Sequence, residues 1–386
     1  MTQPPALPQD LETGSFALRL MTPEGPCVVA LRQGQAFDMT PAFGTASAWF
    51  NTEDPLAAIA ARGRPMALDL PAALANAHHA AQDPQKPWLL APIDLQVIKA
   101  AGVTYVRSML ERVIEERCRG DASQAEAIRA EVRGMIGDDL ANLVPGSPEA
   151  ARVKAALVEK GWWSQYLEVG IGPDAEIFTK APVLSAVGPG AKVGVHPVSQ
   201  WSNPEPEAVM VVSAQGKILG ATLGNDVNLR DVEGRSALLL GRAKDNNAAC
   251  ALGPLIRLFD EGFTLEDVRQ GELTLTITGR DGFALEETGR IGVISRDPTE
   301  VVGQMIGAHH QYPDGAVLFL GTPFSPSKDR GAAGMGFTHH AGDVVRIATP
   351  RLGALENEVD RTDSCPPWRF GIGALMANLA KRGFPQ

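Results

Sequence analysis

The chain has 386 residues, 44% of them hydrophobic, which is long enough for one large domain with a smaller one beside it. Its formal net charge of −10 comes with no visible cluster of Lys and Arg, so we expect no nucleic-acid partner. No run of 18 apolar residues is present, the first residues lack the pattern of a secretory signal, and the four cysteines have neither zinc nor disulfide spacing. These features exclude a membrane span and predict a cytoplasmic protein with reduced thiols.

Residues 1–88 predict a small N-terminal α/β domain. Alternating apolar residues indicate short strands there, and alanine-rich stretches indicate short helices. The proline-bearing segment 82–88 marks the junction with a larger domain at 89–386. We expect strands at 15–21, 26–32 and 35–39 and helices at 45–50, 56–63 and 70–82, the last with His78 and His79 on its surface.

The larger domain is expected to begin with helices and continue as sheet. A strand-like segment precedes a helix that starts after Thr104, and Pro145-Gly146-Ser147 signals the start of another helix. From Ile171 onward, short apolar stretches separated by turns predict a largely β roll or sandwich, so the overall class is α+β. The expected strands are 177–195, 207–213, 217–224, 271–279, 290–296, 316–323 and 342–359, and the expected helices among them are 230–243 and 297–311.

Three carboxylates are predicted to meet on a β-hairpin. Glu205 and Glu207 are two residues apart, so on a strand their side chains share one face. The apolar run 208–212 follows, Gln215-Gly216 supplies a turn, and the returning strand ends at Asp226. Three carboxylates without a nearby Cys or His suit a hard cation, Mg²⁺ first and Mn²⁺ or Ca²⁺ next. The hairpin therefore predicts a metal site with positions open for water or substrate.

Other side chains around this hairpin could contribute to catalysis or binding. Lys244 lies in a polar stretch before a Gly-Pro turn, which is typical of a loop bordering a cavity, and near a cation it could move a proton. Arg230, four residues after Asp226, could brace a metal carboxylate or bind a substrate carboxylate. Gly321 and Thr322 follow an apolar strand and offer a backbone N–H and a hydroxyl to a carboxylate.

An ordered series of short motifs carries a family resemblance. The series reads ExE at 205–207, NDxxxRD at 225–231, AKD at 243–245, GTP at 321–323, GDVV at 342–345 and LGxLENEV at 352–359. No single motif is specific, but the ordered set is. From about Leu89 to the C-terminus the chain resembles the catalytic domain of the fumarylacetoacetate hydrolase family.

This resemblance implies a fold and a set of site residues. The fold of the family is a mixed β-roll, in agreement with the strand pattern. The family metal, usually Mg²⁺, is held by the residues that correspond to Glu205, Glu207 and Asp226. The resemblance also implies that Lys244 lies in the active site, that Thr322 contacts a substrate carboxylate, and that Arg230 and Lys180 line or support the pocket.

One segment departs from the pattern of the hydrolytic members of the family. They carry a GxNYxxHxxE-like segment in which a His–Glu pair activates water. In residues 102–111, Tyr105 and Glu111 fit this pattern, but Ser108 stands at the His position. Serine cannot act as a base near neutral pH, so hydrolysis is not expected and Ser108 is a candidate for substrate binding. The whole chain is instead similar to the members that dehydrate 2-keto-3-deoxy-pentonates derived from D-xylonate or L-arabinonate.

That similarity implies a metal-dependent hydro-lyase. The carboxylate and 2-keto group of the substrate chelate the metal, a proton leaves C3, the C4 hydroxyl departs, and the product is 2,5-dioxopentanoate. Either Lys244 or Glu111 takes the proton, and spacing does not decide between them. A place near an apolar helix face would raise the pKa of Glu111, which favours it as the acid for the leaving group.

Two other functions remain open, and so does the assembly. A hydrolase cleaving a C–C bond of an acylpyruvate or diketo acid would need another histidine near Ser108, and the candidates are His309, His310, His339 and His340. A non-enzymatic sugar-acid sensor would carry an added DNA-binding or signalling segment, and no such segment is recognised. The family resemblance implies a homodimer or a homotetramer acting on a small 2-keto-3-deoxy sugar acid.

Overall fold

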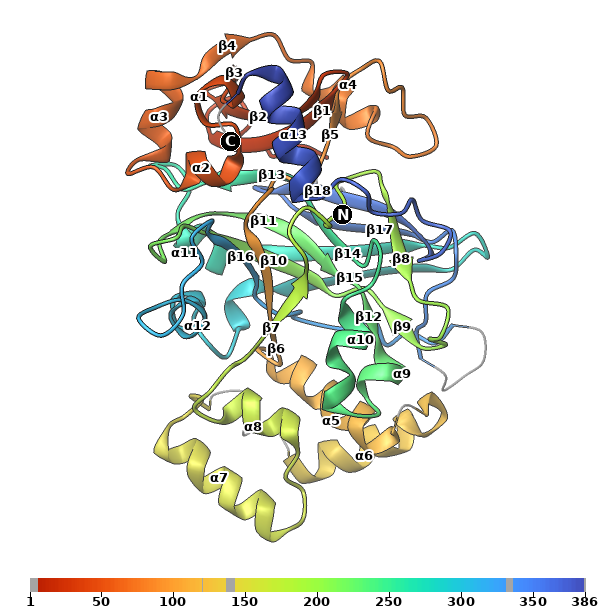
Figure 1. The fold of residues 1–386 in the computed structure, drawn as a ribbon. Coiled ribbons are helices and arrows are strands. Elements are labelled where there is room, and N and C mark those ends of the chain that lie inside the picture. Colours follow the sequence, from red (N-terminus) through yellow and green to blue (C-terminus); the bar gives the residue numbers. More distant parts are fainter. Residues whose placement is uncertain (1–5, 120, 137–142, 331–335, 385–386) are drawn as a thin grey trace.

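A computed structural model of the chain describes residues 6–119, 121–136, 143–330 and 336–384. Figure 1 shows three tiers: the N-terminal segment with the C-terminal helix at one end, β-sheets in the middle, and a group of helices at the other end. The two main sheets and the helices on their faces confirm the expected α+β class with mixed sheets.

The larger sheet contains eleven strands and runs through the whole middle tier. Its strand order is β4-β3-β2-β1-β13-β11-β10-β16-β6-β7, with β5 paired to β1. Neighbours are antiparallel except β16 and β6, which are parallel. The strands are β1 (Ser15–Thr22), β2 (Gly25–Arg32), β3 (Gln35–Asp38), β4 (Arg64–Met66), β5 (Trp88–Leu89), β6 (Val97–Gly102), β7 (Glu176–Ala181), β10 (Pro206–Val212), β11 (Ile218–Asp226), β13 (Cys250–Leu258) and β16 (Ala316–Phe319).

The smaller sheet contains five strands and packs on one face of the larger. Its order is β15-β14-β17-β18-β8, and only β18 and β8 are parallel within it. The strands are β8 (Lys192–Val195), β14 (Glu272–Thr278), β15 (Ala284–Arg290), β17 (Val344–Thr349) and β18 (Gly353–Arg361). A further two-stranded pair consists of β9 (Ser202–Asn203) and β12 (Asn228–Leu229).

Both faces of the central strands are covered, which explains the continuous apolar run in β10. Met210 belongs to the core that β10 and β11 share with β14, β17 and β18 of the smaller sheet. Val209 and Val211 face the other way, into a core shared with Trp49 and Phe50 from the N-terminal helices. Because alternate residues point to opposite faces, a strand buried on both sides reads as unbroken apolar sequence.

The helices cover the sheet faces and form the end opposite the N-terminal segment. Helix α7 begins where the sequence predicted, with the Ser147 hydroxyl accepting a hydrogen bond of 3.1 Å from the Ala150 N–H. Over the described ranges, no helix combines the length and apolarity needed to cross a membrane. The helices are α1 (Thr40–Phe43), α2 (Ala46–Phe50), α3 (Pro55–Arg62), α4 (Leu70–Ala75), α5 (Val106–Cys118), α6 (Ala125–Ile136), α7 (Pro148–Glu159), α8 (Gln165–Ile171), α9 (Arg230–Glu233), α10 (Leu240–Lys244), α11 (Leu265–Arg269), α12 (Pro298–Met305) and α13 (Ile372–Arg382).

Several expected elements differ from the structure in type or extent. The helix expected at 70–82 ends at Ala75, because the Asn76 amide donates to the backbone carbonyls of Asp83 and Lys86 and closes a turn. As a result, His78 and His79 lie beyond the helix, in turns. The strand expected at 290–296 is instead the preceding β15, followed by a short 3₁₀ helix at Ile291–Val293. β15 carries charged residues because it is an edge strand. The strand was predicted too late in the chain because the apolar residues lie after β15.

Another error concerns β13, whose first residues, up to the Gly253-Pro254 turn, were expected to belong to a loop. Its run of apolar residues contains Gly253 and Pro254, which are typical turn residues. The pairing of β13 with β11 is shifted around these residues, from Gly253 opposite Leu223 to Arg257 opposite Ala221. A break in register therefore accommodates a glycine and a proline inside a central strand.

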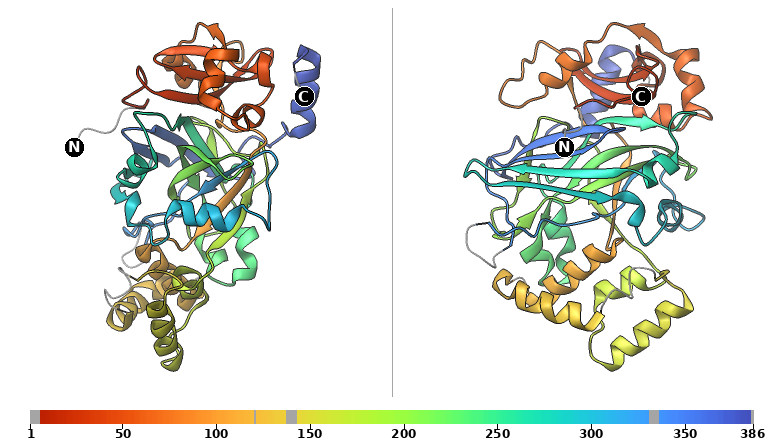
Figure 2. Two further views of the ribbon diagram at one scale, coloured as in Figure 1. Left: turned by 90° about the vertical axis from the view of Figure 1, so that its left-hand side faces the viewer. Right: turned by 180° about the vertical axis from the view of Figure 1, so that it is seen from behind.

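The N-terminal and C-terminal ends of the chain are joined to the middle tier and to each other. β1 continues the larger sheet by pairing with β13, with Phe16 opposite Arg257. Helix α13 stands against the N-terminal segment (Figure 2), where Asn378 donates to the Glu24 carbonyl at 2.8 Å. The domain boundary expected near residue 88 stays a prediction. The backbone pairing of β1 with β13 joins the chain before this boundary to the chain after it.

Candidate active site

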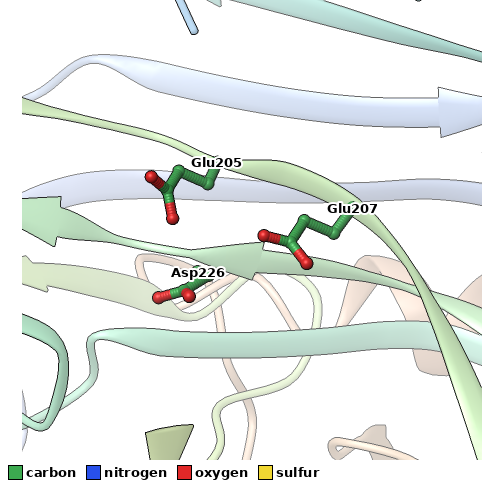
Figure 3. Close-up of side chains that lie close together, drawn as sticks. All are labelled: Glu205, Glu207 and Asp226. Carbon is green, nitrogen blue, oxygen red and sulfur yellow. The ribbon is translucent and has the colours of Figure 1, made fainter. Parts of the chain in front are cut away.

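The hairpin brings three buried carboxylates together as predicted. β10 and β11 pair antiparallel, and the Asp226 N–H donates to the Glu205 carbonyl at 3.1 Å. Glu205 lies one residue before β10, and its side chain points with that of Glu207 toward Asp226 (Figure 3). Each residue offers an oxygen within 4.8 Å of the others. This group of three residues is called the carboxylate cage below.

Three basic side chains from distant parts of the chain contact the carboxylate cage. Lys244, the last residue of α10, contacts Glu205 and lies 3.2 Å from Asp226. Lys180 in β7 lies 2.7 Å from Asp226 on its other oxygen. Arg112 in α5 contacts the second oxygen of Glu205. Two of the three acids are thus paired with bases.

Glu207 is the exception within the cage. Its carboxylate accepts a hydrogen bond of 2.7 Å from the Gly321 N–H, and no basic side chain of the described residues pairs with it. Burial, together with the charges of Asp226 and Glu205, raises the pKa of Glu207 well above its ordinary value. Three buried carboxylates, one of them without a basic partner, fit a hard divalent cation, since oxygen ligands and local negative charge are what such an ion requires.

A small cavity opens beside the carboxylate cage. Its volume is about 20 Å³, which is room for a single water molecule. The sequence-predicted residues that line it, besides the cage itself, are Ser108, Lys244, Gly321 and Thr322. Thr322 points its hydroxyl to the Phe324 carbonyl at 2.6 Å, so a ligand carboxylate would have to displace that bond.

The start of α5 is fixed against the strands that end at this cavity. The Thr104 hydroxyl donates to the Leu320 carbonyl at 2.5 Å, and the Tyr105 hydroxyl donates to the Ile291 carbonyl at 3.0 Å. Val103 lines the cavity with a backbone φ of 58°, a left-handed conformation that is strained for a β-branched residue. These contacts orient the first two helical turns of α5 toward the carboxylate cage.

Lys180 and Arg230 lie behind the cavity wall. Lys180 is fully buried, and besides Asp226 it donates to the Val227 carbonyl at 3.2 Å. Arg230 pairs with Glu115 at 2.6 Å and stacks 4.6 Å from the centre of the Trp201 ring. Both residues therefore support the site from behind.

Glu111 is not brought to the cavity. Arg129 holds its carboxylate at 2.9 Å, and Arg230 approaches it to 3.5 Å. Although burial works in the opposite direction, these arginines lower the pKa of Glu111 below its ordinary value. The expectation of a raised pKa is wrong, because the helix face that carries Glu111 meets basic side chains from α6 and α9.

None of the described histidines lines the cavity. His309 and His310 follow α12 on the surface. His339 is buried with its ring 3.3 Å from Asp343, and His340 is exposed near Asp281. The position occupied by Ser108 is therefore not filled in space by a histidine from the described segments.

Glu176 lines the cavity and was missed by the sequence analysis. It lies in β7, and over the described segments its carboxylate has no ion pair or hydrogen bond. Burial, followed by the charge of Glu233, raises the pKa of Glu176 to about 7. The spacing of Glu176 and Phe178 places both on one face of a strand, but it does not indicate that this face lines the cavity.

Arg112 and Glu233 were missed as well. Arg112 follows Ser108 by one helical turn, so the two side chains share a face of α5, and both line the cavity. Arg112 lies 2.8 Å from Glu233 and 2.6 Å from Glu115. Nothing in the local sequence around Glu233 indicates that α9 carries it to the cavity.

Two dehydratases are similar to this chain over about half of its length. One is the probable 2-keto-3-deoxyxylonate dehydratase of Haloferax volcanii, 32% identical over 195 residues, which cover 50% of this chain and 63% of that protein. The other is the 2-dehydro-3-deoxy-D-arabinonate dehydratase of Saccharolobus solfataricus, 32% identical over 186 residues, which cover 48% of this chain and 59% of that protein. The chain thus spans less than two thirds of the length of either relative.

Solved structures share the fold over most of the chain. A 2-keto-3-deoxyarabinonate dehydratase superposes with a TM-score of 0.61 at 23% identity, covering 90% of this chain and 99% of that one. A 2-keto-3-deoxy-D-arabinonate dehydratase complexed with magnesium and 2,5-dioxopentanoate gives a TM-score of 0.59 at 21% identity, with the same coverage. At these identities the likeness establishes the fold alone.

The family follows from a match that covers the cage. The family model described as fumarylacetoacetate (FAA) hydrolase C-terminal matches residues 168–360, half of the chain. That range holds all three cage carboxylates together with Lys180, Lys244 and Thr322. With the fold, the cage and this match in agreement, the chain belongs to the fumarylacetoacetate hydrolase family.

Proposed function

We propose that this chain is a Mg²⁺-dependent hydro-lyase that removes water from a 2-keto-3-deoxy-pentonate and yields 2,5-dioxopentanoate. The observation that carries the proposal is the cavity itself, in which a cage of carboxylates, a lysine and a carboxyl group with a raised pKa meet. The relatives named as dehydratases of such acids support the choice of substrate.

The cage would hold the metal. Glu205, Glu207 and Asp226 supply the oxygen ligands, and Mn²⁺ or Ca²⁺ could replace Mg²⁺ on the same donors. When bound, the ion would supply electrophilic stabilisation of the negative charge that develops on a 2-keto group when the neighbouring carbon loses a proton. The hydrogen bond from the Gly321 N–H orients the Glu207 carboxylate.

Two groups of the chain divide the proton transfers. Lys244 and Glu176 both line the cavity, and each can hold or release a proton at a side-chain atom. The group that starts unprotonated takes the proton from C3, and the group that starts protonated gives its proton to the departing C4 hydroxyl. Although burial acts in the opposite direction, the charges of Asp226 and Glu205 raise the pKa of Lys244, which favours Lys244 as the acid and Glu176 as the base. A pKa near 7 suits Glu176 for this work, because it is present in both forms at neutral pH. In this proposal Glu176 replaces Glu111, which faces arginines instead of the cavity.

Polar groups on the cavity wall would orient the substrate. The Thr322 hydroxyl can turn from the Phe324 carbonyl to a substrate carboxylate, as the family resemblance implies. Ser108 offers a small hydroxyl at the start of α5. Since serine cannot activate water as a base, these residues bind a hydroxylated acid without hydrolysing it.

The test compares dehydration with C–C cleavage. Purified protein loaded with Mg²⁺ is incubated with 2-keto-3-deoxy-D-xylonate, with its L-arabinonate counterpart, and separately with an acylpyruvate. We expect 2,5-dioxopentanoate from at least one pentonate and no pyruvate from the acylpyruvate. Pyruvate from the acylpyruvate without dehydration of either pentonate would establish the hydrolase instead.

A second measurement separates the base from the acid. In D₂O, substrate recovered from the Glu176→Gln and Lys244→Met variants is examined by NMR for deuterium at C3. The variant that lacks the base should lose exchange at C3, and the variant that lacks only the acid should exchange without dehydrating. Exchange and dehydration at the wild-type rate in both variants would remove both residues from the mechanism.

The location and the assembly complete the proposal. A cytoplasmic location is supported by the four cysteines, which are all buried and unpaired. A homodimer or homotetramer is proposed from the family resemblance, and sedimentation analysis of the purified protein would measure it.

A further inference from the structure

Basic side chains already contact the cage in the absence of a metal. They are Lys180, Lys244 and Arg112, and they pair with Glu205 and Asp226. All of these side chains are buried. A divalent cation bound to the same carboxylates would come close to these positive charges and be repelled by them, since charges interact strongly in a medium of low dielectric constant. Withdrawal of one base would relieve this repulsion.

Space acts in the same direction. The cavity of about 20 Å³ is too small for an ion together with a five-carbon acid. Each oxygen of Glu205 already has a donor, Arg112 on one and Lys244 on the other. Release of one of these contacts would give a metal freer access to the Glu205 carboxylate.

Arg112 is the base best placed to leave. Lys180 is fixed by Asp226 and by the Val227 carbonyl, and both acids that pair with Lys244 belong to the cage. Arg112 instead has two acids outside the cage: Glu115 at 2.6 Å and Glu233 at 2.8 Å, both on Nη1. Its contact with Glu205 uses the other nitrogen, Nη2. Arg112 can therefore release Glu205 and stay paired.

We propose that Arg112 is the stand-in cation of the metal-free site: it neutralises Glu205 until a divalent cation binds, and it then releases Glu205 and opens the cavity. The inference rests on the metal site of the proposed function but not on its substrate. Arg112 acts as a positioning residue, because it sets the state of Glu205 and the space beside it. The two hydrogen bonds from Nη1, to Glu115 and to Glu233, remain in place during this exchange.

The metal affinity of an Arg112→Met variant tests the proposal. Calorimetric titration of the chelator-treated protein with MgCl₂, without substrate, should give binding about fivefold tighter than wild type or more, because the competing cation is gone. The matched control is Arg129→Met, since Arg129 pairs with Glu111 and Glu126 outside the cavity. Its Mg²⁺ affinity should equal that of wild type.

Opposite outcomes overturn the proposal. If Arg112 oriented Glu205 for the metal instead of competing with it, Arg112→Met would bind Mg²⁺ about tenfold more weakly. Unchanged affinity, or an equal gain in Arg129→Met, would also contradict it.

A second measurement needs no variant, so it remains decisive if Arg112→Met does not fold. In a crystal of the wild-type protein soaked with MgCl₂, Arg112 should have left Glu205 while still bound to Glu115 and Glu233. An Arg112–Glu205 contact beside a bound ion would refute the exchange. Both experiments read metal binding directly, so an error in the proposed substrate would not change their outcome.

Discussion

Replacement of Glu176 by glutamine should stabilise the metal-free protein at pH 8 and change it much less at pH 5. Burial raises the pKa of Glu176 to about 7, whereas an unfolded chain gives a glutamate its ordinary value of about 4.3. Between these values the folded state binds more protons than the unfolded state, so the free energy of unfolding falls as the pH rises. Glutamine stays neutral throughout and removes this dependence.

The expected size follows from the two pKa values. The difference between the folded and unfolded pKa values of Glu176 lowers the free energy of unfolding by about 3 to 4 kcal/mol at pH 8 and about 1 kcal/mol at pH 5. The gain from Glu176→Gln should therefore be about 2 to 3 kcal/mol larger at pH 8 than at pH 5. Other buried carboxyl groups, such as Glu207, titrate in both proteins, so they cancel in the comparison.

Urea unfolding in the presence of a chelator measures this difference. Wild type and Glu176→Gln are compared at both pH values, with the exposed Glu53→Gln variant as the control for the chemistry of the substitution. If the free energies of unfolding of wild type and Glu176→Gln differ by the same amount at pH 5 and at pH 8, then Glu176 does not titrate between these pH values. The case for Glu176 as a proton-transfer group would then lose its electrostatic basis.

Three further predictions concern the cage and its surroundings. Glu207→Gln should fold but lose Mg²⁺ binding in calorimetry, and a melting temperature that still rises on addition of MgCl₂ would contradict this. Glu111→Gln should lower stability by about 2 kcal/mol, because Arg129 loses a charged acceptor, yet keep its turnover number; a hundredfold slower enzyme would return Glu111 to the catalytic set. Tyr105→Phe should cost about 1 kcal/mol in urea unfolding, since the Ile291 carbonyl loses its donor, and an unchanged midpoint would show that water replaces the hydroxyl.

The carboxylate cage could be predicted because its geometry is local. Glu205, Glu207 and Asp226 lie on one hairpin, and the alternation of side chains along a strand is enough to bring them together. No knowledge of other elements is needed. The same rule places Glu176 and Phe178 on one face of β7, but it does not show that this face borders the cavity.

The partners of these groups could not be read in the same way. The sequence predicted an apolar environment for Glu111. In the structure, Glu111 is instead paired with Arg129 of α6, which lies 18 residues further along the chain. Arg112 meets Glu205 across 93 residues and Glu233 across 121. Such pairings depend on how helices dock on the sheet, which helical periodicity does not determine. The strand β13 was missed for a related reason, since its glycine and proline are tolerated only because its pairing with β11 shifts around them, which the sequence does not reveal.

The pairing of β1 with β13 has a consequence for shortened versions of the protein. β13 is buried on both faces and lies between β1 and β11. A fragment starting after residue 88 would lack the partner strand of Ile256 and Arg257, so the backbone N–H and C=O groups of β13 would face solvent there. Such a bare edge recruits strands from other molecules, so the fragment should precipitate or form fibrils where the full chain stays in solution.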